Sequence, residues 1–222
     1  DEDAEGDPGG GDRERDLALA EEPRADERRH HGRGGVDEVV AQQDHAQEIL
    51  EQYSPASEDR FELGSVAAST QVGTGRILVM AQNKVFNDTG NGDPATTTAV
   101  NFATDQDYGG SSGFPTGSTY KIFTLTDWLQ TGHGLGDIVD GDQREFTSFP
   151  AKCDGGAWVG KYKPRNDSGG NAGPVSVMSA TSGSINAAFM SMAQQLDLCD
   201  IRDVATSMGV HRANGNPLST LP

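Results

Sequence analysis

TGSTYKIFTLTDWLQTGHG, residues 116–134, is the stretch that decides the fold of this chain. Apolar side chains recur in it every three or four residues, which is typical of one buried helical face, at Ile122, Leu125, Trp128 and Leu129. Residues 116–118 offer hydroxyl groups that can cap the first turn, and glycines from Gly132 onward end the pattern. The segment therefore predicts a helix over 118–130.

The same segment contains S-x-x-K at Ser118 and Lys121, which occurs nowhere else in the chain. On a helix, a three-residue step places the two side chains on one face, one turn apart. A serine hydroxyl is a weak nucleophile unless a neighbouring group, such as a lysine with a lowered pKa, accepts its proton. Ser118 also lies at a helix start, where backbone N–H groups favour negative charge on an attacked carbonyl. We interpret Ser118 as a nucleophile and Lys121 as its base; the competing interpretation of Lys121 is a solvated surface charge.

A second motif, S-x-N, is formed by Ser184 and Asn186 and is also unique in the chain. A second hydroxyl near the first can relay a proton to a leaving amine, and an amide side chain can hold a substrate amide. Taken alone, the motif is equally an N-cap for the helix that follows. Beside S-x-x-K, we interpret both residues as parts of one site.

The other elements are predicted from local patterns. In chain order, they are a helix over 36–53, a hairpin within 61–84 that turns at Gly73–Gly75, a long loop over 87–117, an irregular region over 137–175, a short helix or strand over 175–181, and helices over 187–196 and 201–208.

The first 35 residues differ from the rest because they hold many Asp, Glu, Arg and Gly residues and few large apolar ones. Ordering such a segment costs more entropy than burial can recover. We therefore expect residues 1–45 to form a disordered N-terminal segment, or one that is not selected protein sequence at all, followed by a domain over 46–222.

The chain has 34 Asp and Glu against 17 Lys and Arg, a formal net charge of −17. Such a surface repels phosphate backbones, so we expect no nucleic-acid partner. No window is apolar enough to span a membrane. The histidines and cysteines do not fall at metal-ligand spacing, and we expect no metal and no cofactor.

Two cysteines are present, at positions 153 and 199. They fit either a disulfide in an exported protein or two unpaired small core residues, and the residues alone leave both interpretations open.

S-x-x-K and S-x-N correspond to two of the three motifs of penicillin-binding proteins and class A β-lactamases. The surrounding sequence strongly resembles the transpeptidase domain of class A penicillin-binding proteins of actinobacteria. The resemblance covers residues 46–222 and is carried by QVGTGRILVMAQNKVFND (71–88), NFATDQDYGGSSGFPTGSTYKIFTLTDWLQTGHGLGD (101–137) and SATSGSINAAFMSMAQQLDLCDIRDVATSMGVHRANG (179–215).

The resemblance implies an α+β fold of the serine β-lactamase and transpeptidase type, with helices flanking an antiparallel sheet, truncated at the C-terminus. It implies a peptidoglycan D,D-transpeptidase that cross-links cell-wall stem peptides through a serine acyl-enzyme and binds penicillin and other β-lactams. Ser118 would attack the stem peptide, Lys121 and Ser184 would move the proton, and Asn186 would hold the substrate amide. The protein would act outside the cytoplasm, at the outer face of the bacterial cell membrane, with an anchor upstream of this chain. The resemblance also favours a disulfide between the two cysteines.

The chain departs from this family in three respects: the K-T-G motif is missing, glycosyltransferase motifs are absent, and residues 1–45 do not match the expected linker. We therefore expect an enzymatic parent protein, whereas the chain without K-T-G can be inactive. Alternatives are a D,D-carboxypeptidase or β-lactamase of the same fold, a non-catalytic penicillin-binding sensor module, and a structural fragment that no longer folds.

Overall fold

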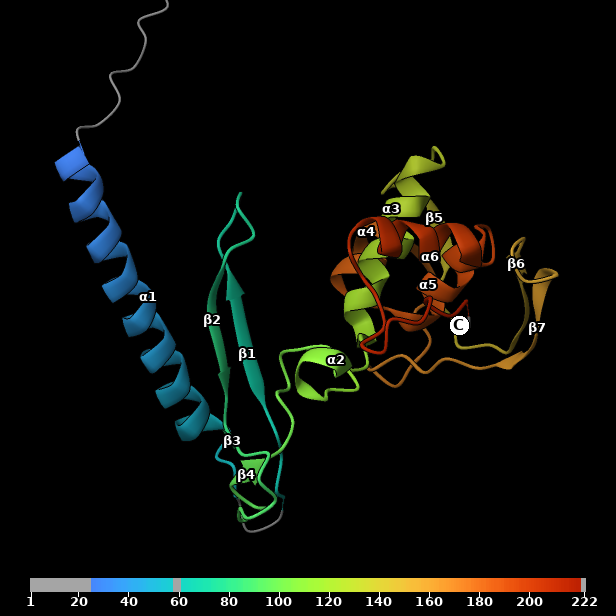
Figure 1. The fold of residues 1–222 in the computed structure, drawn as a ribbon. Helices are drawn as coiled ribbons and strands as arrows, with labels where there is room; N and C mark the ends of the chain where they lie inside the picture. Colours follow the sequence, from blue (N-terminus) through green and yellow to red (C-terminus); the bar gives the residue numbers. More distant parts are fainter. Residues whose placement is uncertain (1–24, 58–60, 221–222) are drawn as a thin grey trace, which may run out of the picture.

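The computed structural model of the protein describes residues 25–57 and 61–220. Two parts are joined by a loop-rich connection: a long helix beside a hairpin, and a cluster of helices with short strands (Figure 1). The elements are, in order, α1 (Ala25–Tyr53), β1 (Val66–Thr70), β2 (Ile77–Gln82), β3 (Val85–Phe86), β4 (Thr97–Thr98), α2 (Gln106–Gly109), the 3₁₀ turn η1 (Gly117–Tyr120), α3 (Lys121–Gln130), β5 (Ile138–Asp140), β6 (Phe146–Ala151), β7 (Gly156–Tyr162), β8 (Pro174–Ser176), α4 (Val177–Ser182), α5 (Asn186–Ala193) and α6 (Leu198–Ser207). No helix among the described residues is both long and apolar enough to cross a membrane.

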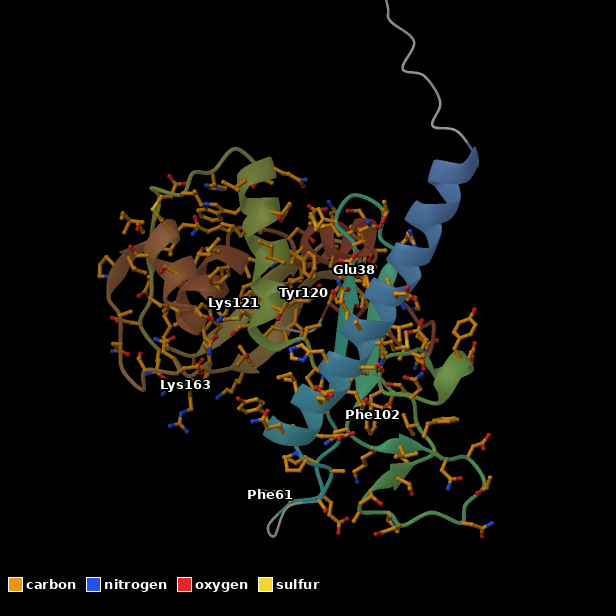
Figure 2. The ribbon with its side chains drawn as sticks, turned by 90° about the vertical axis from the view of Figure 1, so that its left-hand side faces the viewer. Glu38, Phe61, Phe102, Tyr120, Lys121 and Lys163 are labelled. Atoms are coloured by element: carbon orange, nitrogen blue, oxygen red, sulfur yellow. A yellow bond between two sulfur atoms is a disulfide. The ribbon has the colours of Figure 1, made fainter. Side chains whose placement is uncertain are left out.

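The predicted hairpin is confirmed as the antiparallel pair β1–β2. Its turn uses positive φ angles at Gly73 (83°) and Gly75 (71°), a conformation that glycine adopts without a Cβ clash. Helix α1 runs along the hairpin (Figure 2). The amide of Gln43 donates to the Met80 carbonyl at 3.0 Å and accepts from the Met80 N–H at 2.9 Å, while Gln47 donates to the Gln82 carbonyl at 3.0 Å. Side chains of α1 thus satisfy backbone groups of β2 that its partner strand leaves unpaired.

The start of α1 differs from the sequence-based expectation. The helix begins at Ala25, eleven residues before the predicted start at Val36, so residues 25–45 of the segment expected to be disordered are helical. The helix predicted over 36–53 is confirmed as the rest of α1. Alanine, glutamate and arginine in ADERR favour a helix, and the docked part of α1 provides a turn from which the helix propagates without new nucleation. Residues 1–24 lie outside the described residues, and the domain boundary at 45/46 stays a prediction.

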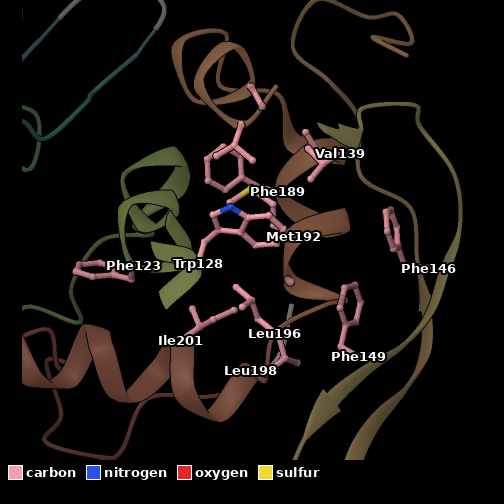
Figure 3. Packing of buried hydrophobic residues seen from close by; sticks show 14 of the residues in the cluster. Phe123, Trp128, Val139, Phe146, Phe149, Phe189, Met192, Leu196, Leu198 and Ile201 are labelled. Atoms are coloured by element: carbon pink, nitrogen blue, oxygen red, sulfur yellow. The ribbon is translucent and has the colours of Figure 1, made fainter. Parts of the chain in front are cut away.

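The hydrophobic core lies between α3, α4, α5, α6 and the strands β5 and β6 (Figure 3). Helix α5 is its centre, because six of its eight residues are buried. The largest fully buried side chains are Trp128, Phe146, Phe149, Phe189 and Met192. The Trp128 indole N–H donates to the Gly134 carbonyl at 3.2 Å, which satisfies the only polar atom of this buried ring. The predicted helices over 187–196 and 201–208 are confirmed as α5 and α6, with bounds shifted by one to three residues.

The region 137–175 is predicted to be irregular, and this prediction is wrong. It contains β5 to β8, with β5 paired to β8 and β6 paired to β7, both antiparallel. The strands are short, and the β6–β7 register shifts between Phe146 and Ser148, so alternation along β6 is broken. Phe146, Phe149 and Ala151 nevertheless point into the core and are fully buried.

The fold is a mixture of helices and strands, as expected, but its sheets are small. The described residues form four separate two-stranded sheets, one of them the parallel pair β3–β4, rather than one antiparallel sheet flanked by helices. The helical part and the β1–β2 hairpin are the elements that match the expected architecture.

A disulfide joins Cys153 and Cys199, as the family resemblance predicted. It links the turn between β6 and β7 to the first turn of α6. Two further contacts support the junction: the Lys152 N–H donates to Asp197 at 3.0 Å, and the Lys152 ammonium contacts the Asp200 carboxylate. The hairpin β6–β7 is therefore fixed to α6 by a covalent bond and by polar contacts.

We expect the double substitution Cys153→Ser and Cys199→Ser to lower the free energy of unfolding by about 4 kcal/mol, because the cross-link closes a loop of 46 residues in the unfolded chain. Urea denaturation of oxidised wild type and the double variant measures this difference. Reductant should reproduce the loss in wild type and leave the variant unchanged; equal midpoints for oxidised wild type and variant would contradict the prediction.

Candidate active site

Ser118 lies in the 3₁₀ turn η1, directly before α3. The predicted helix over 118–130 is confirmed in position, although its first residues form this tighter turn and the α-helix begins at Lys121. The expected capping by 116–118 is not observed, because no side chain caps either η1 or α3. Gly117 has a positive φ of 54°, which turns the incoming loop so that the exposed Ser118 stands at the end of the helix.

Lys121 connects the two sequence motifs. Its ammonium lies 3.1 Å from the Ser118 hydroxyl, 2.8 Å from the Ser184 hydroxyl and 2.7 Å from the Ser184 carbonyl, and it donates to the Asn186 side-chain oxygen. The Ser184 hydroxyl donates to that of Ser118 at 3.1 Å. The structure thus brings together all four residues that the sequence singled out, across a separation of 63 residues between Lys121 and Ser184.

Ser184 lies in the tight connection between α4 and α5. It has a φ of 48° and is the one non-glycine residue with positive φ among the described residues. A serine in this left-handed conformation carries backbone strain of about 1–3 kcal/mol. Hydrogen bonds from Ser184 N to Thr181 O (3.1 Å) and from Ile185 N to Ala180 O (2.9 Å) hold the connection. No sequence pattern indicated this strained backbone, which directs both the hydroxyl and the carbonyl of Ser184 toward Lys121.

Asn186 occupies the first position of α5. The alternative interpretation of the S-x-N motif as an N-cap is wrong, because no side chain caps the start of this helix. Its amide nitrogen donates to the Arg165 carbonyl at 2.6 Å. Since a carbonyl only accepts, this contact requires the amide nitrogen to face Arg165 and the amide oxygen to face Lys121. The orientation of Asn186 is therefore determined by its neighbours.

Asn166 supports the site from behind and was missed in the sequence analysis. This side chain is almost fully buried and donates to the carbonyls of Gly141 (3.0 Å) and Gly170 (2.9 Å). Its oxygen accepts from the Ala187 N–H at 3.0 Å, at the start of α5. It thereby fixes the loop that presents the Arg165 carbonyl. Its partners Gly141 and Ala187 lie 25 and 21 residues away in the sequence, so no local pattern indicated its role.

Burial lowers the pKa of Lys121 from its ordinary value, and the carboxylate of Asp167 opposes this by raising it. A lowered pKa increases the fraction of neutral amine, which is the form that can accept a proton from a hydroxyl. The neutral amine has two N–H donors and one lone pair. The Ser184 carbonyl and the Asn186 oxygen can only accept, so they take the two donors and leave the lone pair for one hydroxyl. Because the Ser184 hydroxyl donates to Ser118, the Ser118 hydroxyl is the one left to donate to Lys121.

Metal ligands are not gathered at this site. Within residues 25–57 and 61–220, no three His, Cys, Asp or Glu side chains come together in a way that could hold a metal ion.

Comparison with known proteins adds one similar structure. No family model matches the chain, and no curated protein matches it. The penicillin-binding protein PonA1 from Mycobacterium tuberculosis superimposes with a TM-score of 0.51 and 23% sequence identity, over 76% of this chain. The chain shares the fold of part of a penicillin-binding protein. It spans 36% of the length of that structure.

We predict that Asp167→Asn lowers the pKa of Lys121 further, because it removes the negative charge that favours the ammonium. An NMR titration that follows the Lys121 side-chain carbon next to the amine should show its midpoint move to lower pH. Asp88→Asn, which removes the charge of an aspartate elsewhere in the chain, is the matched control and should leave the midpoint in place. A midpoint that rises or stays fixed in Asp167→Asn would contradict the assignment.

Proposed function

We propose that the chain belongs to a peptidoglycan D,D-transpeptidase that acts through a serine acyl-enzyme and is acylated by penicillin. The observation that carries this proposal is the contact of Lys121 with the hydroxyls of both Ser118 and Ser184. The shared fold with a penicillin-binding protein supports it independently.

In the proposed reaction, the neutral Lys121 accepts the Ser118 proton as the Ser118 oxygen attacks the carbonyl carbon of the penultimate D-alanine. The resulting tetrahedral intermediate collapses and the C–N bond breaks. The departing D-alanine amine receives the proton from Lys121 through the Ser184 hydroxyl. An ester between Ser118 and the stem peptide remains.

The second half of the reaction reverses these roles. The amine of a second stem peptide attacks the ester carbonyl and gives its proton to Lys121 through Ser184. The Ser118 oxygen leaves and recovers a proton, and a new amide bond cross-links the two peptides. We propose that Asn186 holds the amide of the substrate while it keeps Lys121 in place. A β-lactam would acylate Ser118 by the same first step, with its ring amide as the broken bond.

The proposed setting follows from this reaction. A cell-wall cross-linking enzyme acts outside the cytoplasm, at the outer face of the membrane, and the Cys153–Cys199 disulfide is compatible with an oxidising compartment. We propose residues 46–222 as part of the penicillin-binding domain, in a parent protein anchored to the membrane upstream.

A D,D-carboxypeptidase or β-lactamase would use the same acyl-enzyme with water as the acceptor, and a sensor module would stop at the acyl-enzyme. The geometry of Ser118, Lys121 and Ser184 serves acylation in all of these cases. These classes of protein differ in the acceptor that reacts with the acyl-enzyme.

The test of the nucleophile is labelling of the folded chain with a fluorescent penicillin, followed by intact-mass analysis and peptide mapping. We expect one covalent adduct on Ser118, lost in Ser118→Ala and retained in the matched control Ser112→Ala, which removes an exposed hydroxyl from the same loop. If Ser118→Ala labels equally, the proposed function is wrong. If the folded wild-type chain gives no adduct, this chain is not competent for acylation by itself, and the same result with a longer chain that includes a K-T-G strand would overturn the assignment of Ser118. A stable adduct without turnover of a D-Ala-D-Ala peptide would identify the sensor instead.

Replacement of Lys121 by methionine should slow acylation by about 10²–10⁴-fold, because the side chain keeps a similar unbranched stem but has no amine that can accept a proton. Stopped-flow measurement of penicillin acylation gives this rate for the wild type and the variant. Lys84→Met, which removes a lysine from the connection after β2, provides the control. An unchanged rate in Lys121→Met would exclude Lys121 as the base.

A further inference from the structure

A negatively charged pocket lies at the end of α3 farther from Ser118. It has a volume of about 430 Å³ and lies between the last turns of α3 and the face of α6 that runs from Asp200 in its first turn to Ser207 at its end. The residues that matter for its chemistry are Asp127, Asp200, Asp203, Thr131, Val204 and Ser207. It shares no residue with the candidate active site, so a ligand bound here would contact none of the residues of the proposed reaction.

Asp127 is the unusual member of this pocket. It is only 4% exposed, and its Oδ2 has no hydrogen-bond partner among the described residues. Burial raises the pKa of this carboxyl, the carboxylates of Asp200 and Asp197 raise it further, and Lys152 opposes them. Burying a carboxylate without a hydrogen-bond partner raises the free energy of the folded protein, so its presence in this pocket needs an explanation.

The other carboxylates of the pocket are already paired with cationic side chains. Asp200 contacts the Lys152 ammonium, and Asp203 accepts from the Arg202 guanidinium at 2.7 Å. Neither α3 nor α6 has a basic residue in its last turn. The C-terminal end of a helix is the negative end of its dipole and favours a cation. Within the part of the chain that the structure describes, Asp127 lies in the last turns of α3, close to the carboxylates at the start of α6, and it has no cation of its own.

The shape and lining of the pocket indicate which cation would fit. The carboxylates are not gathered closely enough for a metal site among the described residues. The pocket is much larger than a bare ion, and Val204 offers an apolar contact at its wall. The Thr131 and Ser207 hydroxyls each donate to a backbone carbonyl, which leaves their oxygens free to accept. Lys152 on Asp200 shows that these aspartates accept an ammonium group.

We propose that this pocket binds a primary ammonium group on an aliphatic stem, with Asp127 as its buried anionic partner. The ammonium donates to Asp127 and to the hydroxyl oxygens at the two helix ends. The stem lies against Val204. A lysine side chain of another protein and a small aliphatic diamine present the same chemistry, and the experiment separates these two sources.

The test is an NMR titration of the full chain with Nα-acetyl-lysine methylamide at constant ionic strength. We expect saturable shifts of the Thr131 and Ser207 amide signals. The norleucine analogue, which has the same stem without the charge, should give none. Asp127→Asn keeps the side-chain shape and should weaken binding at least tenfold, whereas Asp88→Asn should have no effect.

A second variant, Asp203→Asn, should weaken binding less than Asp127→Asn, because Asp203 already pairs with Arg202. If Asp127→Asn does not fold, the binding test is carried out with Asp203→Asn. Tighter binding of 1,5-diaminopentane than of the lysine analogue would identify a free diamine as the source, and the reverse order a lysine side chain. The absence of saturable shifts in the wild type, equal binding of the norleucine analogue, or unchanged binding in folded Asp127→Asn would each overturn the proposal.

Discussion

Burial of α5 is the constraint on which the helical part of the structure depends. Six of its eight residues are buried, so α3, α4, α6 and β5 must pack around it on nearly every side. The start of α5 is the exception, since Asn186 is only partly buried there and faces Lys121. Packing of an apolar helix, worth about 25 cal/mol for each Å² of apolar surface removed from water, therefore also sets the positions of the polar groups at its end.

Helix α3 carries its two key charges in the arrangement opposite to the one its dipole favours. Lys121 is a partly buried cation at the N-terminal end, and Asp127 is a buried acid in the last turns. Burial shifts the pKa of each group toward its neutral form, and the helix dipole acts in the same direction. At the N-terminal end the consequence is an amine suited to accept a proton. At the C-terminal end it is a carboxyl group that an external cation would stabilise.

Hydrogen bonds also fix the polar groups of the site in position, which is what proton transfer between closely spaced groups requires. Asn186 is oriented by the Arg165 carbonyl, the loop that carries this carbonyl is fixed by Asn166, and Ser184 is held in a strained turn by two backbone hydrogen bonds. Backbone strain of this kind persists only where the surrounding structure over-determines it. The likeness to a penicillin-binding protein accounts for the fold, whereas the proposed chemistry depends on these contacts.

The sequence by itself determined the features that local spacing encodes. The three-residue step from Ser118 to Lys121, the alternation and glycine turn of β1–β2, and the helical periods of α3, α5 and α6 all follow from neighbouring residues, and the structure agrees with them. The tertiary structure alone decided the rest. The proximity of Lys121 to Ser184, the left-handed backbone of Ser184 and the supporting role of Asn166 all depend on contacts between segments far apart in the chain. The strands of 137–175 were missed for the same reason, because short strands with an interrupted register are stabilised by the core they cover and leave little periodic signal in the sequence.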